Sequence, residues 1–110
     1  MKQVSLESTR YLHIVSRKKL LEGARRHSES EAPLEIWYRS AKKAKWKTLE
    51  DVRKTWPSAD GVTVGEKTYT VFNIGGNKFR LIVKIEYQMQ RLYIKHVLTH
   101  AEYDKENWKK

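Results

Sequence analysis

The sequence feature that most constrains the fold is a pair of glycines, Gly75 and Gly76, between two segments that alternate apolar and polar residues. The segments run from 69 to 74 and from 78 to 85. Because glycine adopts positive φ without strain, a short glycine turn between two such segments is typical of a β-hairpin. In the second segment one face is apolar, with Phe79, Leu81, Val83 and Ile85. The other face is mostly cationic, so we expect a strand with one buried side.

Upstream of the hairpin, the pattern predicts a strand followed by helices. Residues 11–15 are rich in β-branched and aromatic types, which favours a short strand. Ser16 is then placed to cap a first helix, whose buried stripe we expect to be Leu20, Leu21 and Ala24.

A second helix is predicted to begin at Ser28 or Ser30 and to end near Ala44 or Lys45. Its apolar residues recur with helical spacing, at Leu34, Trp37, Tyr38 and Ala41. Aromatic side chains at this spacing usually pack in the core, and we expect that here.

Two further elements follow on either side of Pro57. Thr48 with Asp51 three residues later resembles a capping box, which predicts a short helix that Pro57 stops. Residues 58–61 read as a turn, and a weaker pattern at 62–64 favours a short strand.

Residues 91–98 predict the last strand, in one of two registers. Either Leu92, Ile94, His96 and Leu98 point inward, or Tyr93, Lys95 and Val97 do.

Together these elements predict an α+β fold, in which an N-terminal strand and two to three helices pack on a mainly antiparallel sheet of four or five strands. With 110 residues the chain is long enough for one hydrophobic core, so we expect a single domain over residues 11–110. Residues 1–10 are polar and patternless, and we expect a disordered extension there.

The charge of the chain indicates its class of partner. Lys and Arg number 23 against 13 Asp and Glu, a net charge of +10, so a polyanion, and nucleic acid first, is the expected partner. The absence of cysteine excludes disulfides and thiolate metal sites. No apolar run approaches the roughly 20 residues that span a bilayer, and no signal peptide is recognisable, so we expect a cytoplasmic protein without a membrane partner.

Several segments are similar to a known family. They are Ile14–Leu20, Ala32–Leu34, Trp37–Tyr38, Phe72–Leu81 and Thr99–Lys105. The Asn-Ile-Gly-Gly-Asn hairpin followed by Thr-His-Ala-Glu-Tyr-Asp is the specific part, and with it the chain resembles the HigB-type toxins of the RelE/ParE superfamily.

The resemblance implies a RelE-like toxin of a type II toxin–antitoxin system that cleaves mRNA, usually within translating ribosomes, without a metal or other cofactor. It also implies a cognate helix-turn-helix antitoxin of the HigA type. Operator DNA would be contacted only through the complex with that antitoxin.

RNA cleavage of this kind needs a base for the ribose 2′-hydroxyl, a cation on the phosphate and a donor for the leaving 5′ oxygen. The candidate catalytic residues are Arg80, His100, Glu102, Tyr103 and Asp104. Arg80 matches the strand arginine of RelE-like nucleases and could hold a phosphate by two parallel hydrogen bonds. His100 and Tyr103 are the candidate proton-transfer pair, and which of them is the base stays open. Glu102 and Asp104 could orient that pair or act as the base.

A second set of residues is predicted to bind RNA. It consists of Asn73, Lys78, Lys84, Lys95, Lys42 and Lys43. Lysines neutralise phosphates, whereas Asn73 is chosen because it lies within the matched hairpin motif. Asn73 and Asn77 flank the glycine turn, where turn chemistry is a strong interpretation of both, and Asn73 is the better site candidate of the two. His96 and His100 have the spacing of a metal pair but no clear third ligand, so no metal site is predicted.

Two other functions fit the charge. A ParE-like relative would inhibit DNA gyrase and lack the His100–Tyr103 cluster, and a supercoiling assay would identify it. A non-catalytic module that binds RNA or the ribosome would give the same salt-dependent affinity, but its activity would survive Arg80→Ala and Tyr103→Phe.

Overall fold

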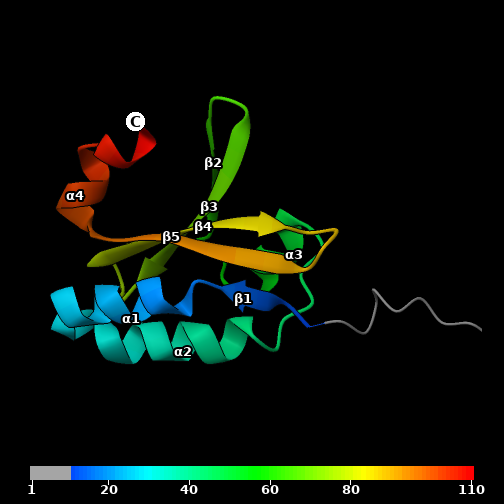
Figure 1. Cartoon of the computed structure of the whole chain (residues 1–110), viewed down its shortest axis with the longest axis horizontal. Coiled ribbons are helices and arrows are strands. Elements are labelled where there is room, and N and C mark those ends of the chain that lie inside the picture. The colour runs from blue at the N-terminus through cyan, green and yellow to red at the C-terminus, as the bar shows by residue number, and fades with distance from the viewer. Residues whose placement is uncertain (1–10) are drawn as a thin grey trace, which may run out of the picture.

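The computed structural model describes residues 11–110, which form a five-stranded sheet in the order β1-β5-β4-β3-β2 (Figure 1). The strands are β1 (His13–Val15), β2 (Asp60–Val64), β3 (Lys67–Ile74), β4 (Phe79–Glu86) and β5 (Arg91–Thr99). The helices are α1 (Arg17–Arg26), α2 (Glu31–Ala41), α3 (Leu49–Thr55) and α4 (His100–Asp104), with 3₁₀ turns η2 (Ser28–Ser30) and η3 (Asn107–Lys109). β1 is parallel to β5, and the other pairs are antiparallel.

This architecture confirms the predicted α+β class and the mainly antiparallel sheet. The extension predicted for residues 1–10 lies outside the described residues. Within residues 11–110 there is no helix with the length and apolar character needed to cross a membrane.

The glycine hairpin forms as predicted. Ile74 pairs with Phe79 at the ends of β3 and β4, and Gly75 and Gly76 adopt φ angles of 64° and 69° in the turn. A side chain at either position would be strained, because L-residues rarely adopt this conformation. The turn therefore fixes the register of the two central strands.

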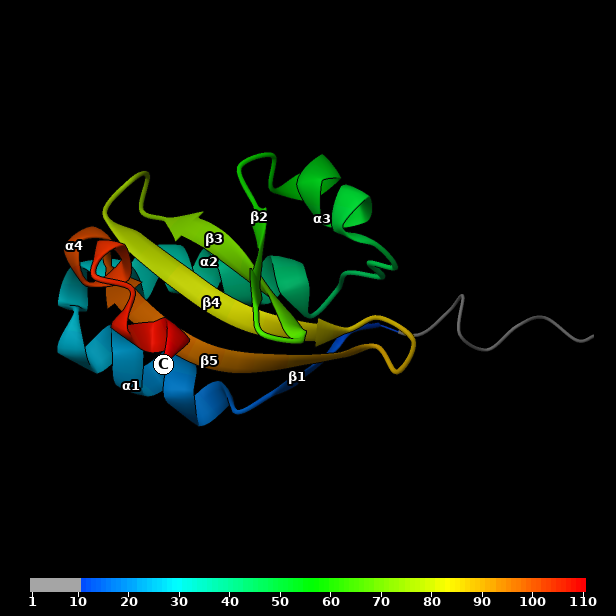
Figure 2. The ribbon, with the colours of Figure 1, turned by 90° about the horizontal axis from the view of Figure 1, so that it is seen from above.

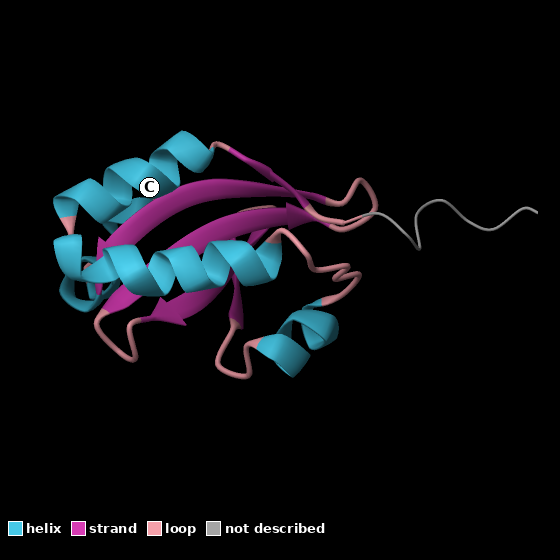
Figure 3. Ribbon diagram, turned by 90° about the horizontal axis from the view of Figure 1, so that it is seen from below, coloured by secondary structure: helices cyan, strands magenta, loops and turns pink. Residues whose placement is uncertain are grey.

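Helices α1 and α2 cover one face of the sheet, which we call the inner face (Figure 3). Its centre is Phe72 of β3, a fully buried side chain surrounded by three tryptophans. The ring centroids of Trp37, Trp46 and Trp56 lie 5.4, 6.1 and 6.1 Å from that of Phe72. Burial of a large apolar side chain contributes about 1.5–3 kcal/mol, so this cluster anchors α2 and α3 to the sheet.

Helix α1 packs closer to the sheet than its sequence suggests. Leu20 is buried as predicted, but Leu21 is 49% exposed, and Gly23 faces the sheet instead. A Cβ atom added to Gly23 would lie 2.5 Å from the Cβ of Val97 in β5. Leu21 was wrongly assigned to the buried stripe because only the tertiary contact with β5 shows which face of α1 is buried.

Neither register predicted for the last strand holds along its whole length. Leu92 and Ile94 point inward in the first half of β5, whereas Val97 points inward in the second half. The cause is a β-bulge, since Ile82 pairs with His96 while the next residue, Val83, pairs with Ile94. Lys95 is the extra residue of the bulge, and the side chains beyond it change faces.

The helix termini agree with the sequence in part. Thr48 caps α3 by accepting a hydrogen bond from the Asp51 backbone N–H at 3.2 Å, as predicted. Ser16 stands at the cap position of α1 but adopts φ 71° and makes no capping hydrogen bond with its side chain. Helix α2 ends at Ala41, before the Ala44 or Lys45 end that was predicted.

The opposite, outer face of the sheet lies between two protruding elements (Figure 2). One is the hairpin of β2 and β3, whose first strand begins at Asp60 inside the expected turn. The other is α4 with η3, where the ring of Trp108 packs edge-on against Tyr69 of β3 at 5.9 Å. Asp60 of β2, Val71 and Asn73 of β3 and Tyr103 of α4 line a hollow on this face, which we call the cleft.

Candidate active site

Arg80 lies on the outer face, as the second residue of β4 next to the glycine turn. It pairs across the ladder with Asn73 of β3, and only 8% of its surface is exposed. The sequence predicted a mostly cationic face here. In the structure much of this face is covered, because Arg80 and Ile82 are both buried beneath the flanking elements, and Lys84 is partly buried.

The guanidinium of Arg80 is held by neutral acceptors of the adjacent turn. Its two terminal nitrogens donate to the side-chain oxygen of Asn77 at 2.7 Å, to the Asn77 carbonyl at 3.3 Å and to the Phe79 carbonyl at 3.1 Å. A further contact of 3.0 Å joins Arg80 to Nδ1 of His100. A buried charge requires such partners, and here none of them carries a negative charge.

His100 connects this arginine to a carboxylate. Its Nε2 lies 3.0 Å from Oδ2 of Asp104, one helical turn later. Because an arginine can only donate, Nδ1 accepts from Arg80 in the neutral imidazole, and the proton then sits on Nε2 facing Asp104. In the imidazolium, Nδ1–H can instead donate to the Asn77 carbonyl, 3.2 Å away.

Tyr103 approaches Arg80 from the other side. The Arg80 Cζ lies 5.8 Å from the centroid of the phenol ring, and the ring of Trp108 stacks on the same phenol at 5.6 Å with an interplanar angle of 15°. Partial burial, and next the carboxylate of Asp60, raise the pKa of Tyr103 above its ordinary value. The phenol is therefore protonated at neutral pH and suited to donate a hydrogen bond or a proton.

The helix that carries His100, Tyr103 and Asp104 begins with a capping box. Thr99 accepts from the Glu102 N–H at 3.1 Å, and the Glu102 carboxylate accepts from the Thr99 N–H at 2.9 Å. This second bond holds the pKa of Glu102 below its ordinary value. The carboxylate also lies 3.7 Å from Nε2 of His27, so the structure engages Glu102 in the cap and with α1 rather than with Arg80.

Arg80 and Tyr103 open onto a hollow of about 590 Å³ on the outer face. Its lining is Arg53, Pro57, Ser58, Ala59, Asp60, Val71, Asn73, Arg80 and Tyr103. Asn73, predicted to bind RNA, thus lies beside Arg80. His100 and Asp104 stand at the Asn77 side of Arg80, with side chains that are 42% and 60% exposed.

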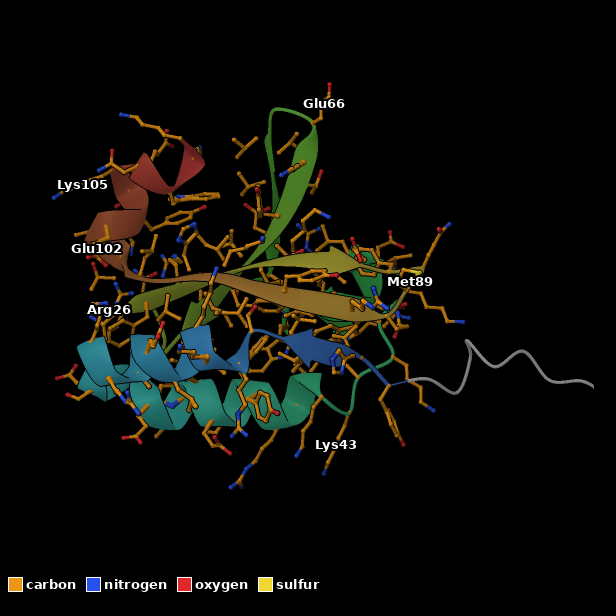
Figure 4. The ribbon with its side chains drawn as sticks, in the orientation of Figure 1. Arg26, Lys43, Glu66, Met89, Glu102 and Lys105 are labelled. Carbon is orange, nitrogen blue, oxygen red and sulfur yellow. The ribbon has the colours of Figure 1, made fainter. Side chains whose placement is uncertain are left out.

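The predicted RNA-binding lysines do not form one cluster. Lys84 lies on the outer face, 3.8 Å from Glu86, whereas Lys78 lies in the hairpin turn, 3.3 Å from Glu29. Lys95 lies at the bulge of β5 and lines a separate groove against α1. Lys42 and Lys43 follow α2, on the helical side of the sheet, and Figure 4 shows Lys43 far from α4. Their role in RNA binding stays a prediction.

Three residues of the site were not singled out from the sequence. Asn77 was interpreted as turn chemistry, yet it contacts both Arg80 and His100. Arg53 lines the hollow and is fixed by a 2.8 Å hydrogen bond from its Nε to the Ala59 carbonyl. Trp108 carried no signal at all. Helix α4 was also missed, although the Thr99-x-x-Glu102 spacing of a capping box could have predicted its start.

Across residues 11–110, no group of three His, Asp or Glu side chains is arranged so that it could hold a metal ion. The His96 and His100 pair does not form the beginning of such a site. His96 faces Trp108 at 6.4 Å, while both ring nitrogens of His100 have partners in Arg80 and Asp104.

Comparison of the sequence with known proteins identifies the family to which it is similar. Residues 30–106 match the family model described as HigB_toxin, the RelE-like toxic component of a toxin–antitoxin system. This match includes the glycine hairpin, Arg80 and the whole of α4.

Curated relatives match most of the chain. The mRNA interferase HigB of Escherichia coli O6:H1 is 35% identical over 94 residues, which cover 86% of this chain and 90% of the relative. The mRNA interferase toxin HigB of Escherichia coli K12 is 31% identical over 93 residues, covering 84% of this chain and 88% of the relative. The mRNA interferase HigB of Shigella flexneri matches to the same extent.

Proposed function

This chain belongs to the HigB toxin family of RelE-like toxins, and from that membership we propose that it is an endoribonuclease that cleaves mRNA as the toxin of a toxin–antitoxin pair. The observation that supports both the family and the reaction is sequence similarity to mRNA interferases. This similarity extends over more than four fifths of the chain. The geometry that supports the same reaction is a buried arginine on the floor of a cleft, flanked by a phenol and an imidazole–carboxylate pair.

We propose Arg80 as the group that stabilises the scissile phosphate. When the 2′ oxygen attacks the adjacent phosphorus, negative charge grows on the non-bridging oxygens, and a fixed guanidinium in a partly dehydrated site lowers the energy of that state. The loss of one such donor typically costs about 10²–10³ in kcat. Two parallel hydrogen bonds to phosphate would require Arg80 to release a present contact, because both terminal nitrogens already donate to Asn77, Phe79 or His100.

We assign the proton transfers to the two sides of Arg80. Tyr103, whose raised pKa keeps it protonated, donates to the leaving 5′ oxygen. When Arg80 turns from His100 to the phosphate, Nδ1 of His100 becomes free to accept the proton of the 2′-hydroxyl, and Asp104, which faces Nε2, stabilises the imidazolium that forms. The products are a 2′,3′-cyclic phosphate and a free 5′-hydroxyl. In each turnover His100 takes up one proton and Tyr103 gives up one, so the enzyme gains no net proton.

The partners follow from the family. A toxic component of a toxin–antitoxin system has a cognate antitoxin. We propose that this antitoxin is a HigA-like helix-turn-helix protein, and that operator DNA is bound only through the complex. We also propose that cleavage occurs on translating ribosomes, which the net charge of +10 would attract through rRNA phosphates.

The decisive experiment is 5′-end mapping of an mRNA in a reconstituted translation reaction, with the same RNA incubated without ribosomes alongside. Wild type is compared with Arg80→Ala, Tyr103→Phe and His100→Ala, and with Arg39→Ala as a charge-matched control. Arg39 is exposed on α2, where it pairs with Glu35 at 3.0 Å.

We expect cleavage by wild type and Arg39→Ala, a loss of about 10²-fold or more for the three site variants, and dependence on ribosomes. Cleavage that persists undiminished in Arg80→Ala and Tyr103→Phe would reject the assigned site. No cleavage by any form, together with an effect on translation or on gyrase supercoiling, would reject the nuclease itself.

A further inference from the structure

A second concave surface lies outside the cleft, between α1 and β5. This surface, which we call the α1–β5 groove, has a volume of about 530 Å³. Its lining is Lys19, Glu22, Gly23, Arg25, Arg26, Lys95, His96 and Val97. Four of these eight residues are Lys or Arg, and only Glu22 carries a negative charge. In Figure 4 the labelled Arg26 lies at the end of α1 next to β5.

Two features of the backbone bring these cations together. Gly23 forms the floor, where its missing Cβ lets α1 approach Val97 closely. The bulge in β5 inserts Lys95 beside His96, so that a strand lysine faces the lysine and arginines of the helix. The convergence therefore depends on a glycine contact and a bulge, two local features that are seldom accidental.

The groove keeps its positive charge in the free protein. Among the ion pairs of the described residues, none includes Lys19, Arg25 or Lys95, and Arg26 donates to the Val97 carbonyl at 3.0 Å. Burial and then the nearby charges of Lys19, Lys67 and Lys84 lower the pKa of Lys95.

Burial, and then the nearby charges of Lys19, Lys95 and Arg26, lower the pKa of His96 as well. Like charges held this close destabilise the folded chain, and a bound anion would relieve that repulsion.

We propose that the α1–β5 groove is an accessory site that binds the phosphate backbone of RNA. His96 also lines the next hollow, which contains Glu102, Lys105 and Trp108, so the groove adjoins the C-terminal segment that carries the active-site helix. An RNA strand held in the groove therefore remains close to the cleft. The identity of the anion rests on the proposed nuclease function, whereas the presence of an anion site rests on the groove itself.

An acidic peptide is the other class of polyanion, and the groove suits it less. A peptide that folds on binding needs apolar anchors, whereas the only aliphatic side chain that lines this groove is Val97. The separate hollow between α1 and α2 offers Leu20, Leu21 and Leu34 and would serve that purpose better. Phosphate neutralisation requires only cations, and those are what the groove provides.

The test measures binding of a single-stranded RNA with 2′-O-methyl groups at every position, which cannot be cleaved, by fluorescence anisotropy over a range of salt concentrations. The variant is Lys19→Ala with Lys95→Ala. The control, Lys18→Ala with Lys54→Ala, removes the same charge from residues that do not line the groove. Poly-glutamate is tested as a competing anion, thermal unfolding checks the fold, and cleavage is assayed separately with unmodified mRNA.

We expect the groove variant to bind about tenfold more weakly near 0.15 M salt, with a salt slope that is smaller by about 0.7 for each phosphate that is no longer neutralised. Its melting temperature should equal or exceed that of wild type, because repulsion is removed. Its cleavage should show a raised KM with kcat retained, unlike Arg80→Ala.

Equal binding and slope for the groove variant and the control would overturn the proposal. Loss of poly-glutamate binding with RNA binding intact would assign the groove to an acidic protein instead. If wild type cleaves nothing but the groove variant still loses RNA affinity, the nuclease function fails while the groove stands. If wild type cleaves mRNA but the groove variant binds RNA as well as the control does, the groove proposal alone is rejected.

Discussion

The capping box of α4 offers a quantitative test of how the active site is held. Thr99→Ala removes the hydroxyl that accepts from the Glu102 N–H at 3.1 Å. Loss of an N-cap typically costs about 1 kcal/mol, which multiplies the ratio of unfolded to folded helix by about five. Helix α4 has five residues, none of them buried, so this cost should appear as local unfolding rather than as global destabilisation.

The expected result is a specific pair of changes. Thr99→Ala should lower mRNA cleavage by up to about fivefold, because His100, Tyr103 and Asp104 all lie on α4. Its melting temperature should hardly change. Hydrogen exchange of the α4 amides, followed by NMR, should accelerate by up to about fivefold with the opening constant, whereas cleavage should decline in proportion to the folded fraction of α4 that is lost, and Thr99→Ser should restore both.

Thr48→Ala is the matched control, because the Thr48 side chain also accepts from the backbone N–H three residues later, at the start of α3. Helix α3 contributes Val52 to the core and is followed by Trp56, which packs on Phe72, so it should unfold only with the whole domain. A loss of about 1 kcal/mol there should lower the melting temperature by about 4–8 °C and leave α4 exchange unchanged. If Thr99→Ala lowers the melting temperature as much as Thr48→Ala does, with cleavage intact, α4 is part of the global fold and the reasoning is refuted.

Further predictions concern packing, pH and the hairpin turn. Gly23→Ala should destabilise the domain by about 1–3 kcal/mol in thermal unfolding, because the new Cβ would lie 2.5 Å from that of Val97. The raised pKa of Tyr103 means that loss of its proton should reduce kcat only above pH 10, as a pH–rate profile with Tyr103→Phe as reference would show. Asn77→Asp should reduce cleavage more than Asn77→Ala, because a carboxylate would neutralise Arg80; equal losses in the same assay would contradict this.

The sequence was most informative where local chemistry alone determines the structure. The Gly75–Gly76 turn requires positive φ, and the period of two in β4 places Phe79, Leu81 and Val83 in the core whatever surrounds them. For the same reason the cap at Thr48 was predictable. The α+β class followed from the order of these elements.

What the sequence could not provide depends on contacts between distant segments. The bulge at Lys95 has no local signature, since it arises from the pairing of β4 with β5. The burial of Gly23 instead of Leu21 depends on how closely α1 approaches Val97. The role of Asn77 was hidden because a turn asparagine reads the same whether or not an arginine lies within reach.

The partners of Arg80 explain how one side chain can be both buried and available for a phosphate. A buried guanidinium without acceptors would cost several kcal/mol, so the fold supplies the Asn77 amide, two backbone carbonyls and the imidazole of His100. These acceptors are neutral, so they replace water without cancelling the positive charge. The carboxylates nearby are engaged elsewhere, Asp104 with His100 and Asp60 with Arg53. The cleft therefore keeps a net positive field at Arg80, and a phosphate oxygen, which is a stronger acceptor than an amide, can displace Asn77 and gain the ion pair that the free protein leaves unmade.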